Sequence, residues 1–143
     1  MAKPDPALLD PARYPFVTEA DVRFGDIDVN RHINNVALAS FVEEGRVRFH
    51  RASGFFDDVA GRGAMVASLS IEFLGEGHFP GSISVHVGAT RLGTSSYDLA
   101  LLLLQDGRPI ATASSVMVST RHGKPCAIAA STRNAMADWM VRP

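Results

Sequence analysis

The sequence lacks several features that mark special classes of protein. It has a single cysteine, Cys126, so it cannot form an internal disulfide bond, and its Cys and His residues do not show the spacing of a zinc site. Its longest strictly apolar run, from Leu99 to Leu104, is far too short to cross a bilayer. The first residues lack the basic and apolar regions of a signal peptide. We therefore expect a cytoplasmic protein with no metal site and no membrane partner.

An excess of positive charge is also missing. The chain has 14 Lys and Arg residues against 15 Asp and Glu residues, which gives a formal net charge of −1. A surface that binds nucleic acid in general requires a basic excess, so no nucleic-acid partner is expected. The length of 143 residues fits one domain, and the hydrophobic content of 46% is sufficient for a packed core.

Hydrophobic periodicity predicts a strand followed by a long helix. Residues 1–15 contain four of the eight prolines and are expected to form an extended arm, which leaves residues 16–143 as the single domain. From residue 16 to Phe24, apolar and polar residues alternate with the period of a half-buried strand. From about Ile33 the period becomes helical, and Gly54 is a suitable residue to end the helix.

Four further strands are expected after the helix. They lie in residues 63–75, 81–93, 95–107 and 108–123. The connectors are short and rich in Gly or Pro, which favours hairpins and an antiparallel sheet. The predicted fold is α+β, with a curved, mainly antiparallel five-stranded sheet wrapped around one long helix. Residues 97–105 are apolar on both faces, so we expect a second copy of the chain to cover sheet surface.

The segment between the first strand and the helix is unusually polar. From Gly25 to Asn35 (GDIDVNRHINN) it holds two Asp, one Arg, one His and three Asn residues. Asp and Asn are common in turns and at helix N-termini, where Asn34 or Asn35 could cap the helix. Alternatively, an acid beside the unpaired N–H groups of the helix is suited to acyl chemistry. The second interpretation is favoured because one helix needs only one cap.

The segment FGDIDVNRHINNVALASFVEEGRVRF resembles the hotdog-fold thioesterases, in the group that contains 4-hydroxybenzoyl-CoA thioesterase and bacterial acyl-CoA thioester hydrolases. Their pattern is roughly D-x-D-x-x-G-H-V-N-N-x-x-Y, followed by a helix with E-x-x-R or E-E-A-R. The core of the segment is also similar to the D-x-N-x-H-x-x-N motif of acyl-ACP thioesterases. The residues that match this motif are Asp28, Asn30, His32 and Asn35. The chain departs from the first pattern at Arg31, where Gly is usual, and at Leu38, where Tyr is frequent.

The resemblance implies a role for each matched residue. Asp28 is the expected catalytic carboxylate, which acts either as a nucleophile or as a general base on water. The backbone N–H near Asn35 is the expected oxyanion donor, and Asn30 and His32 position water, the thioester or Asp28. Asp26 is expected to be structural.

The same resemblance suggests residues that bind the substrate. Arg31 alters the charge of the loop, and Leu38 leaves an apolar wall that suits an aliphatic acyl chain. A rim that binds the phosphates of CoA needs cations. The candidates near strand ends are Arg91, Ser95, Ser96 and Arg121, with His122 and Lys124 beside them. Glu43 and Glu44 lie on the helix, and we expect Glu44 to pair with Arg48 rather than to act as the catalytic acid.

The expected function is therefore hydrolysis of an acyl-CoA or acyl-ACP thioester by a single hotdog domain, without a cofactor, in a homodimer or homotetramer. Two other functions stay open. One is hydration of an enoyl thioester, although the hydratase motif D-x-N-P-x-H places its His five residues after the Asp, whereas His32 follows Asp28 by four. The other is a non-catalytic module that binds acyl thioesters, which would need no acid beside the helix.

Overall fold

The computed structural model describes residues 4–55 and 61–143, which form one sheet and two α-helices. The strands are β1 (Phe16–Asp21), β2 (Arg62–Phe73), β3 (Ser82–Leu92), β4 (Ser96–Gln105), β5 (Arg108–Arg121) and β6 (Lys124–Pro125). The α-helices are α1 (Asn35–Ala52) and α2 (Ala130–Met136). Short 3-10 helices occur at Pro6–Leu9, Pro11–Arg13, Phe24–Asp26 and Ala137–Trp139. The observed order of strand, helix and further strands is the order that the sequence predicts.

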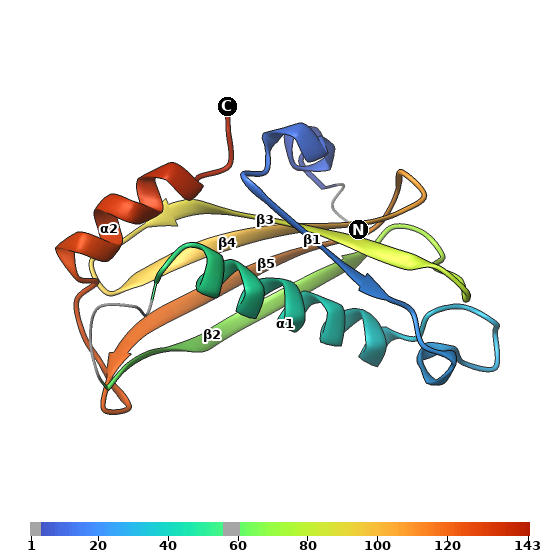
Figure 1. Cartoon of the computed structure of the whole chain (residues 1–143), viewed down its shortest axis with the longest axis horizontal. Coiled ribbons are helices and arrows are strands. Elements are labelled where there is room, and N and C mark those ends of the chain that lie inside the picture. The colour runs from blue at the N-terminus through green and yellow to red at the C-terminus, as the bar shows by residue number, and fades with distance from the viewer. Residues whose placement is uncertain (1–3, 56–60) are drawn as a thin grey trace.

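The sheet is antiparallel throughout, with the strand order β1-β3-β4-β5-β2 (Figure 1). The sequence predicts five strands, and the structure has six, because β6 pairs with the end of β5. A strand of two residues is too short to show an alternating pattern, so it could not be detected. The turn between β4 and β5 consists of Asp106 and Gly107, which both have positive φ, as a tight hairpin requires.

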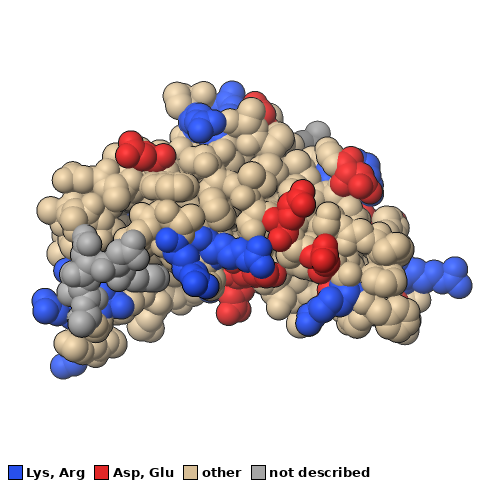
Figure 2. All heavy atoms as spheres, viewed as in Figure 1, with Lys and Arg blue, Asp and Glu red and all other residues tan. Residues whose placement is uncertain are grey.

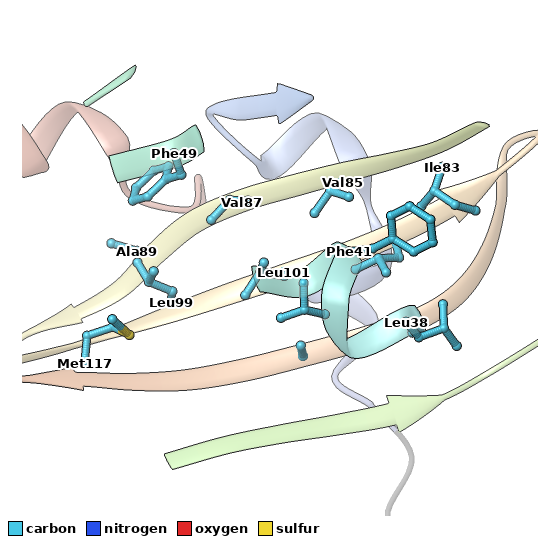
Figure 3. Packing of buried hydrophobic residues seen from close by; sticks show 14 of the residues in the cluster. Leu38, Phe41, Phe49, Ile83, Val85, Val87, Ala89, Leu99, Leu101 and Met117 are labelled. Carbon is cyan, nitrogen blue, oxygen red and sulfur yellow. The ribbon is translucent and has the colours of Figure 1, made fainter. Parts of the chain in front are cut away.

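Helix α1 lies across one face of the sheet and forms one side of the main core (Figure 1). In Figure 3, Phe41 of α1 lies next to Ile83 of β3, and both belong to one buried core cluster with Leu38 and Val85. Gly45 allows the helix to approach the strand closely, since a Cβ atom at that position would overlap the side chain of Val85. Among the described residues, no helix combines the length and the apolar character needed to cross a membrane.

The first strand is shorter than the alternation predicts. β1 ends at Asp21, and Phe24 begins a 3-10 helix with its side chain 80% exposed instead of continuing the strand. The change of direction is held by Asp26, whose carboxylate accepts the backbone N–H of Arg23 at 2.8 Å. Apolar alternation carries no information on such a hydrogen bond, so the prediction extended the strand too far.

The ends of α1 are defined by capping. The helix begins at Asn35 and not at Ile33, because Ile33 forms an isolated antiparallel bridge with Ile27. Asn34 is the N-cap, one of the two caps that the sequence offers. The helix ends just before Gly54, whose φ of 69° confirms the predicted stop.

The outer face of β4 is covered in part by the two ends of the chain itself. The residues of this outer cluster are Tyr14, Ala100, Leu102 and Leu104, with Leu8, Leu9 and Val141 packed against them. The arm is folded into 3-10 helices rather than extended, and the Tyr14 hydroxyl donates to the Leu8 carbonyl at 2.8 Å. Residues 1–3 of the predicted arm lie outside the described residues. The arm and β4 are distant in sequence, so a one-dimensional pattern cannot reveal their contact.

A buried polar pair lies at the C-terminal end of α1, far from the polar junction. The Tyr97 hydroxyl is 2.8 Å from His50 Nε2, and both residues are buried. Burial lowers the pKa of His50 to about 4, with a smaller contribution from the charge of Arg46. Burial also raises the pKa of Tyr97. Both groups are therefore neutral near pH 7, and the pair is a structural part of the core.

Candidate active site

The polar junction is a tight hairpin-like loop that leads into α1. Its two sides are joined at the bridge between Ile27 and Ile33. Inside the loop, the Asp28 N–H donates to the His32 carbonyl and the Arg31 N–H donates to the Asp28 carbonyl, each at 3.0 Å. These bonds fix the backbone around Asp28 although the loop carries exposed side chains.

Arg31 has a φ of 65°, in the left-handed region that glycine adopts without strain. This observation explains why Gly is usual at the matching place in the resembled pattern. The backbone of the loop is the one that such a Gly would form, and only the side chain differs. The side chain of Arg31 is exposed and makes no hydrogen bond or ion pair with the residues that the structure describes.

Asp28 and Asp26 differ sharply in environment. Asp28 is exposed, and its Oδ1 accepts the backbone N–H of Asn30 at 2.8 Å. Its second carboxylate oxygen accepts no hydrogen bond from any described residue. Asp26 is buried and bonds both the backbone and the guanidinium of Arg23, so its expected structural role is consistent with its contacts. Asp28 is therefore the acid of this loop that can act on a ligand.

The N-terminus of α1 adds free backbone donors to the same place. Asn34 Oδ1 accepts the Ala37 N–H at 2.8 Å, and the Asn34 carbonyl accepts the Leu38 N–H. The N–H groups of Asn35 and Val36 have no acceptor within the described part of the chain. Asn35 and Val36 line a groove of about 530 Å³ together with Arg23, Gly25, Asp26, Asp28, Asn34, Ala37 and Ser40. Asp28 and the two residues with free N–H groups thus line one groove.

The sequence interpretation missed two residues of this region, Glu76 and His78. His32 Nε2 lies 3.1 Å from Glu76 Oε2, and the ring of His78 packs edge-on against the ring of His32 with centroids 5.7 Å apart. Both residues belong to the connector GEGHFPG between β2 and β3. The Gly and Pro residues of the connector predict a turn, but a Glu and a His within a Gly-rich loop are a signal that it can carry chemistry.

Hydrogen bonds hold the connector on both sides, so the contact with His32 is part of the folded structure. The Gly77 carbonyl accepts the Ile33 N–H at 2.8 Å. The buried side chain of Gln105 bonds both backbone groups of His78, since its Oε1 accepts the N–H and its Nε2 donates to the carbonyl, each at 2.8 Å. Gly77 has no room for a side chain, because a Cβ there would lie 2.5 Å from Ile33 Cδ1.

The predicted substrate-binding residues lie in three different places. Arg31 is in the loop, and Leu38 is buried in the core one turn into α1. The four candidates for a phosphate-binding rim, Arg91, Ser95, Ser96 and Arg121, lie at the opposite end of the sheet. Since β3 spans that distance with 11 residues, the two ends are roughly 30 Å apart within one chain.

Some of the rim candidates already have partners. Arg91 holds Asp98 through two hydrogen bonds of 2.9 Å and also donates to the Ser96 hydroxyl at 3.0 Å. Arg121 is exposed near Lys124. On the helix, Glu44 pairs with Arg48 at 2.6 Å, as predicted. No group of three His, Cys, Asp or Glu side chains that could hold a metal ion is found in residues 4–55 and 61–143.

The comparison with known families decides the family of this chain. Residues 22–139 match the model of the thioesterase-like superfamily. The chain belongs to the thioesterase-like superfamily. The family expected from the polar motif is therefore confirmed, whereas the match of the individual motif residues stays a prediction. A search of curated proteins finds no match to this chain.

Solved structures agree with this family at the level of the fold. The PA5185 protein of Pseudomonas aeruginosa PAO1 has a TM-score of 0.81 and 24% identity, over 92% of this chain and 95% of that chain. BH1999, a gentisyl-coenzyme A thioesterase, has a TM-score of 0.76 and 21% identity, over 85% and 99%. A thioesterase of Thermus thermophilus, solved with coenzyme A and Zn, has a TM-score of 0.78 and 25% identity, over 91% and 98%.

Proposed function

We propose that this member of the thioesterase-like superfamily hydrolyses acyl thioesters, with Asp28 as the catalytic carboxylate. One observation carries the proposal: Asp28 lines the same groove as Asn35 and Val36, the two residues at the start of α1 whose N–H groups have no acceptor among the described residues. Backbone donors at a helix N-terminus are suited to a carbonyl oxygen that becomes negative during the reaction. Family membership and the CoA-bound Thermus thioesterase support thioesters as the substrate class.

The residues of the loop allow two routes for the reaction. In the first, Asp28 takes a proton from water, and the resulting hydroxide adds to the thioester carbonyl. In the second, Asp28 itself adds and forms a mixed anhydride that water later hydrolyses. In both routes the N–H groups of Asn35 and Val36 stabilise the oxyanion, the C–S bond breaks, and the thiolate leaves and is protonated. Asn30 holds Asp28 in place through its backbone N–H.

A screen for thiol release tests the proposed activity directly. We expect the purified chain to release CoA from at least one member of a panel of short, long and aromatic acyl-CoA thioesters. Parallel acyl-ACP substrates would identify the carrier. Absence of thiol release across the whole panel would contradict the proposal, and formation of a 3-hydroxyacyl product from an enoyl-CoA without free CoA would indicate a hydratase instead.

His32 is proposed to be positioned by Glu76. If the carboxylate accepts the Nε2–H of neutral His32, the Nδ1 atom is left as an acceptor for water or for a proton of the substrate. We expect Glu76→Ala to lower kcat about tenfold with little change in KM, which is the scale of a hydrogen bond to a charged group. The measurement is steady-state kinetics together with NMR of the imidazole nitrogens, which should show loss of a fixed Nε2–H tautomer.

Glu72→Ala is the matched control, since Glu72 is a nearby carboxylate on β2 without a hydrogen-bond partner among the described residues. Glu76→Gln should retain part of the activity, because its amide oxygen can still accept the Nε2–H. An unchanged kcat and an unchanged tautomer in Glu76→Ala would show that the pair is only a surface contact.

We also propose that the protein forms a homodimer through β2. This strand is an edge of the sheet, and its 12 residues present unpaired backbone groups along one side. Val66, Leu69 and Phe73 of this strand are between 40% and 47% exposed. The other edge, β1, is partly protected by Arg48, which donates to the Thr18 hydroxyl and the Glu19 carbonyl. A second copy is the simplest partner for a long apolar edge.

This dimer would also bring the two ends of the sheet together. If β2 pairs with itself in an antiparallel way, the Arg62 end of one strand lies beside the Phe73 end of its partner. The Arg62 end is basic, and Figure 2 shows blue side chains gathered at the lower left, where β2 begins and β5 ends. The opposite end carries the exposed carboxylates of Asp28 and Glu76. The pairing would therefore place the basic Arg62 end of one subunit beside these carboxylates of its partner.

The proposed dimer also suggests which residues contact the substrate. Arg121, Ser95, Ser96 and Arg91 would reach a CoA molecule bound at the loop of the other subunit, and Arg31 would meet it from its own subunit. Leu38 is proposed to form an apolar wall for the acyl chain. The absence of a cofactor, the absence of a nucleic-acid or membrane partner, and a cytoplasmic location remain predictions from the sequence.

A further inference from the structure

Arg23 is the cation of the groove that holds Asp28, and we propose that it binds a carboxylate at the far end of the acyl group of the substrate. The inference rests on the proposed thioester hydrolysis and specifies its substrate class. That class is the acyl thioesters whose acyl group is itself anionic, such as thioesters of dicarboxylic acids.

The position of Arg23 ties it to the reacting centre. It lines the groove of about 530 Å³ together with Asp28, Asn35 and Val36, and it is the only Lys or Arg among the described residues that do so. It also lines the adjoining groove of about 780 Å³ that follows α1 and β1. Arg23 therefore stands where the two grooves meet, within the space that a substrate acyl group would enter.

The guanidinium of Arg23 is held in place while most of its donors stay available. Its Nη2 donates to Asp26 Oδ1 at 3.1 Å. The side chain of Asp26 is only 5% exposed, whereas that of Arg23 is 78% exposed. A guanidinium has five N–H bonds, and the contacts within the described residues use one of them. A buried carboxylate thus orients the group, and its outer N–H bonds can hold a second carboxylate in bidentate geometry.

The charge of Arg23 is not needed by the catalytic acid. Its ion pair is with Asp26, and no ion pair joins it to Asp28 in the part of the chain that the structure describes. Asp28 therefore remains a carboxylate without a cationic partner among the described residues, and the outer N–H bonds of Arg23 stay available for a carboxylate of the ligand.

The position of Arg23 favours an anion that belongs to the acyl group rather than to the carrier. The thioester carbonyl must lie at the N–H groups of Asn35 and Val36 to use them as oxyanion donors. An anion that reaches Arg23 then lies in the same groove as that carbonyl. The phosphates of CoA are separated from its sulfur by the whole pantetheine arm, whereas the second carboxylate of a short diacid is only a few carbons from the carbonyl.

Glutaryl-CoA and its monomethyl ester test the inference, since the two substrates differ only by the methyl group that removes the terminal charge. We expect wild-type kcat/KM to be about tenfold higher for glutaryl-CoA, as for a charge-assisted hydrogen bond. In Arg23→Gln the ratio of the two values should fall to about one, and Arg23→Lys should retain part of it. Because the ratio compares two substrates on one protein, a general loss of stability does not change it.

Arg108→Gln is the control, since Arg108 is exposed at the same end of the sheet and does not line the groove. A wild-type ratio near one, or a ratio that survives in Arg23→Gln, would overturn the inference. The inference would also be overturned if Arg23→Gln lowered kcat/KM equally for both CoA substrates but not for the corresponding N-acetylcysteamine thioesters. In that case the anion bound by Arg23 would be a phosphate of CoA. Failure to hydrolyse any thioester would instead contradict the proposed function itself.

Discussion

Replacement of Asp28 by Asn is expected to leave a folded protein that has lost nearly all thioester hydrolysis. The amide has almost the size of the carboxylate, and its Oδ1 can still accept the Asn30 N–H that Asp28 accepts at 2.8 Å. It cannot take a proton from water, and it is a poor nucleophile towards a thioester. We expect kcat to fall by about 1000-fold, within the range that a general base or a nucleophile contributes. The measurement is thiol release under saturating substrate.

Two further observations make this test specific. The melting temperature of Asp28→Asn should stay close to that of the wild type, because Asp28 is exposed and its side chain makes a single hydrogen bond to the described residues, which Asn can also accept. Asp106→Asn, in the exposed β4–β5 turn, should keep full activity, since Asn tolerates the positive φ at that position. Substantial activity in Asp28→Asn would remove Asp28 from the mechanism. In the wild type, a burst of thiol equal to the enzyme would indicate the mixed anhydride.

Replacement of Leu69 by Glu is expected to convert the dimer into a monomer. Leu69 lies on the edge strand β2 with 42% of its surface exposed, and the proposed interface would bury it against the same strand of the partner. Two carboxylates placed close to a twofold axis would repel each other and would be desolvated without a partner. Light scattering should give a mass near 15.3 kDa instead of twice that value. Activity should fall by at least about tenfold if the partner supplies cations to the site.

Val17→Glu provides the matched control for Leu69→Glu. Val17 is 53% exposed and lies on β1, the opposite edge of the sheet. This variant adds the same charge at a similar exposure and should remain dimeric. A wild-type mass of 15.3 kDa, or a dimeric Leu69→Glu at the same concentration, would contradict the proposed interface.

The sequence predicted the elements whose patterns are local. Helical spacing and Gly54 located the long helix and its end, because both depend on neighbouring residues. The polar run from Gly25 to Asn35 indicated a site at the start of that helix, and one of its two candidate caps, Asn34, is the N-cap. The family was also recognisable from this run, as the match over residues 22–139 confirms.

Errors arose where a side chain bonds or packs at a distance. The carboxylate of Asp26 turns the chain after Asp21, so the first strand ends before Phe24. The apolar outer face of β4 is covered by the N-terminal arm, and its pattern alone could not tell an arm from a second subunit. Periodicity reports how much of an element is buried, but it does not report what buries it.

The sequence by itself indicated the type of fold and the polar loop that holds Asp28, His32 and Asn35, because these follow from local spacing and composition, and it indicated the family through the resemblance of that loop and the helix after it. Only the tertiary structure brought Glu76 to 3.1 Å from His32, since the connector after β2 is separated from the loop by the whole of α1 and β2. It also places Arg23 in the groove with Asp28, and it places Arg91 and Arg121 at the far end of the sheet. Such groupings depend on strand register and on packing, and these are properties of the folded chain rather than of any one segment.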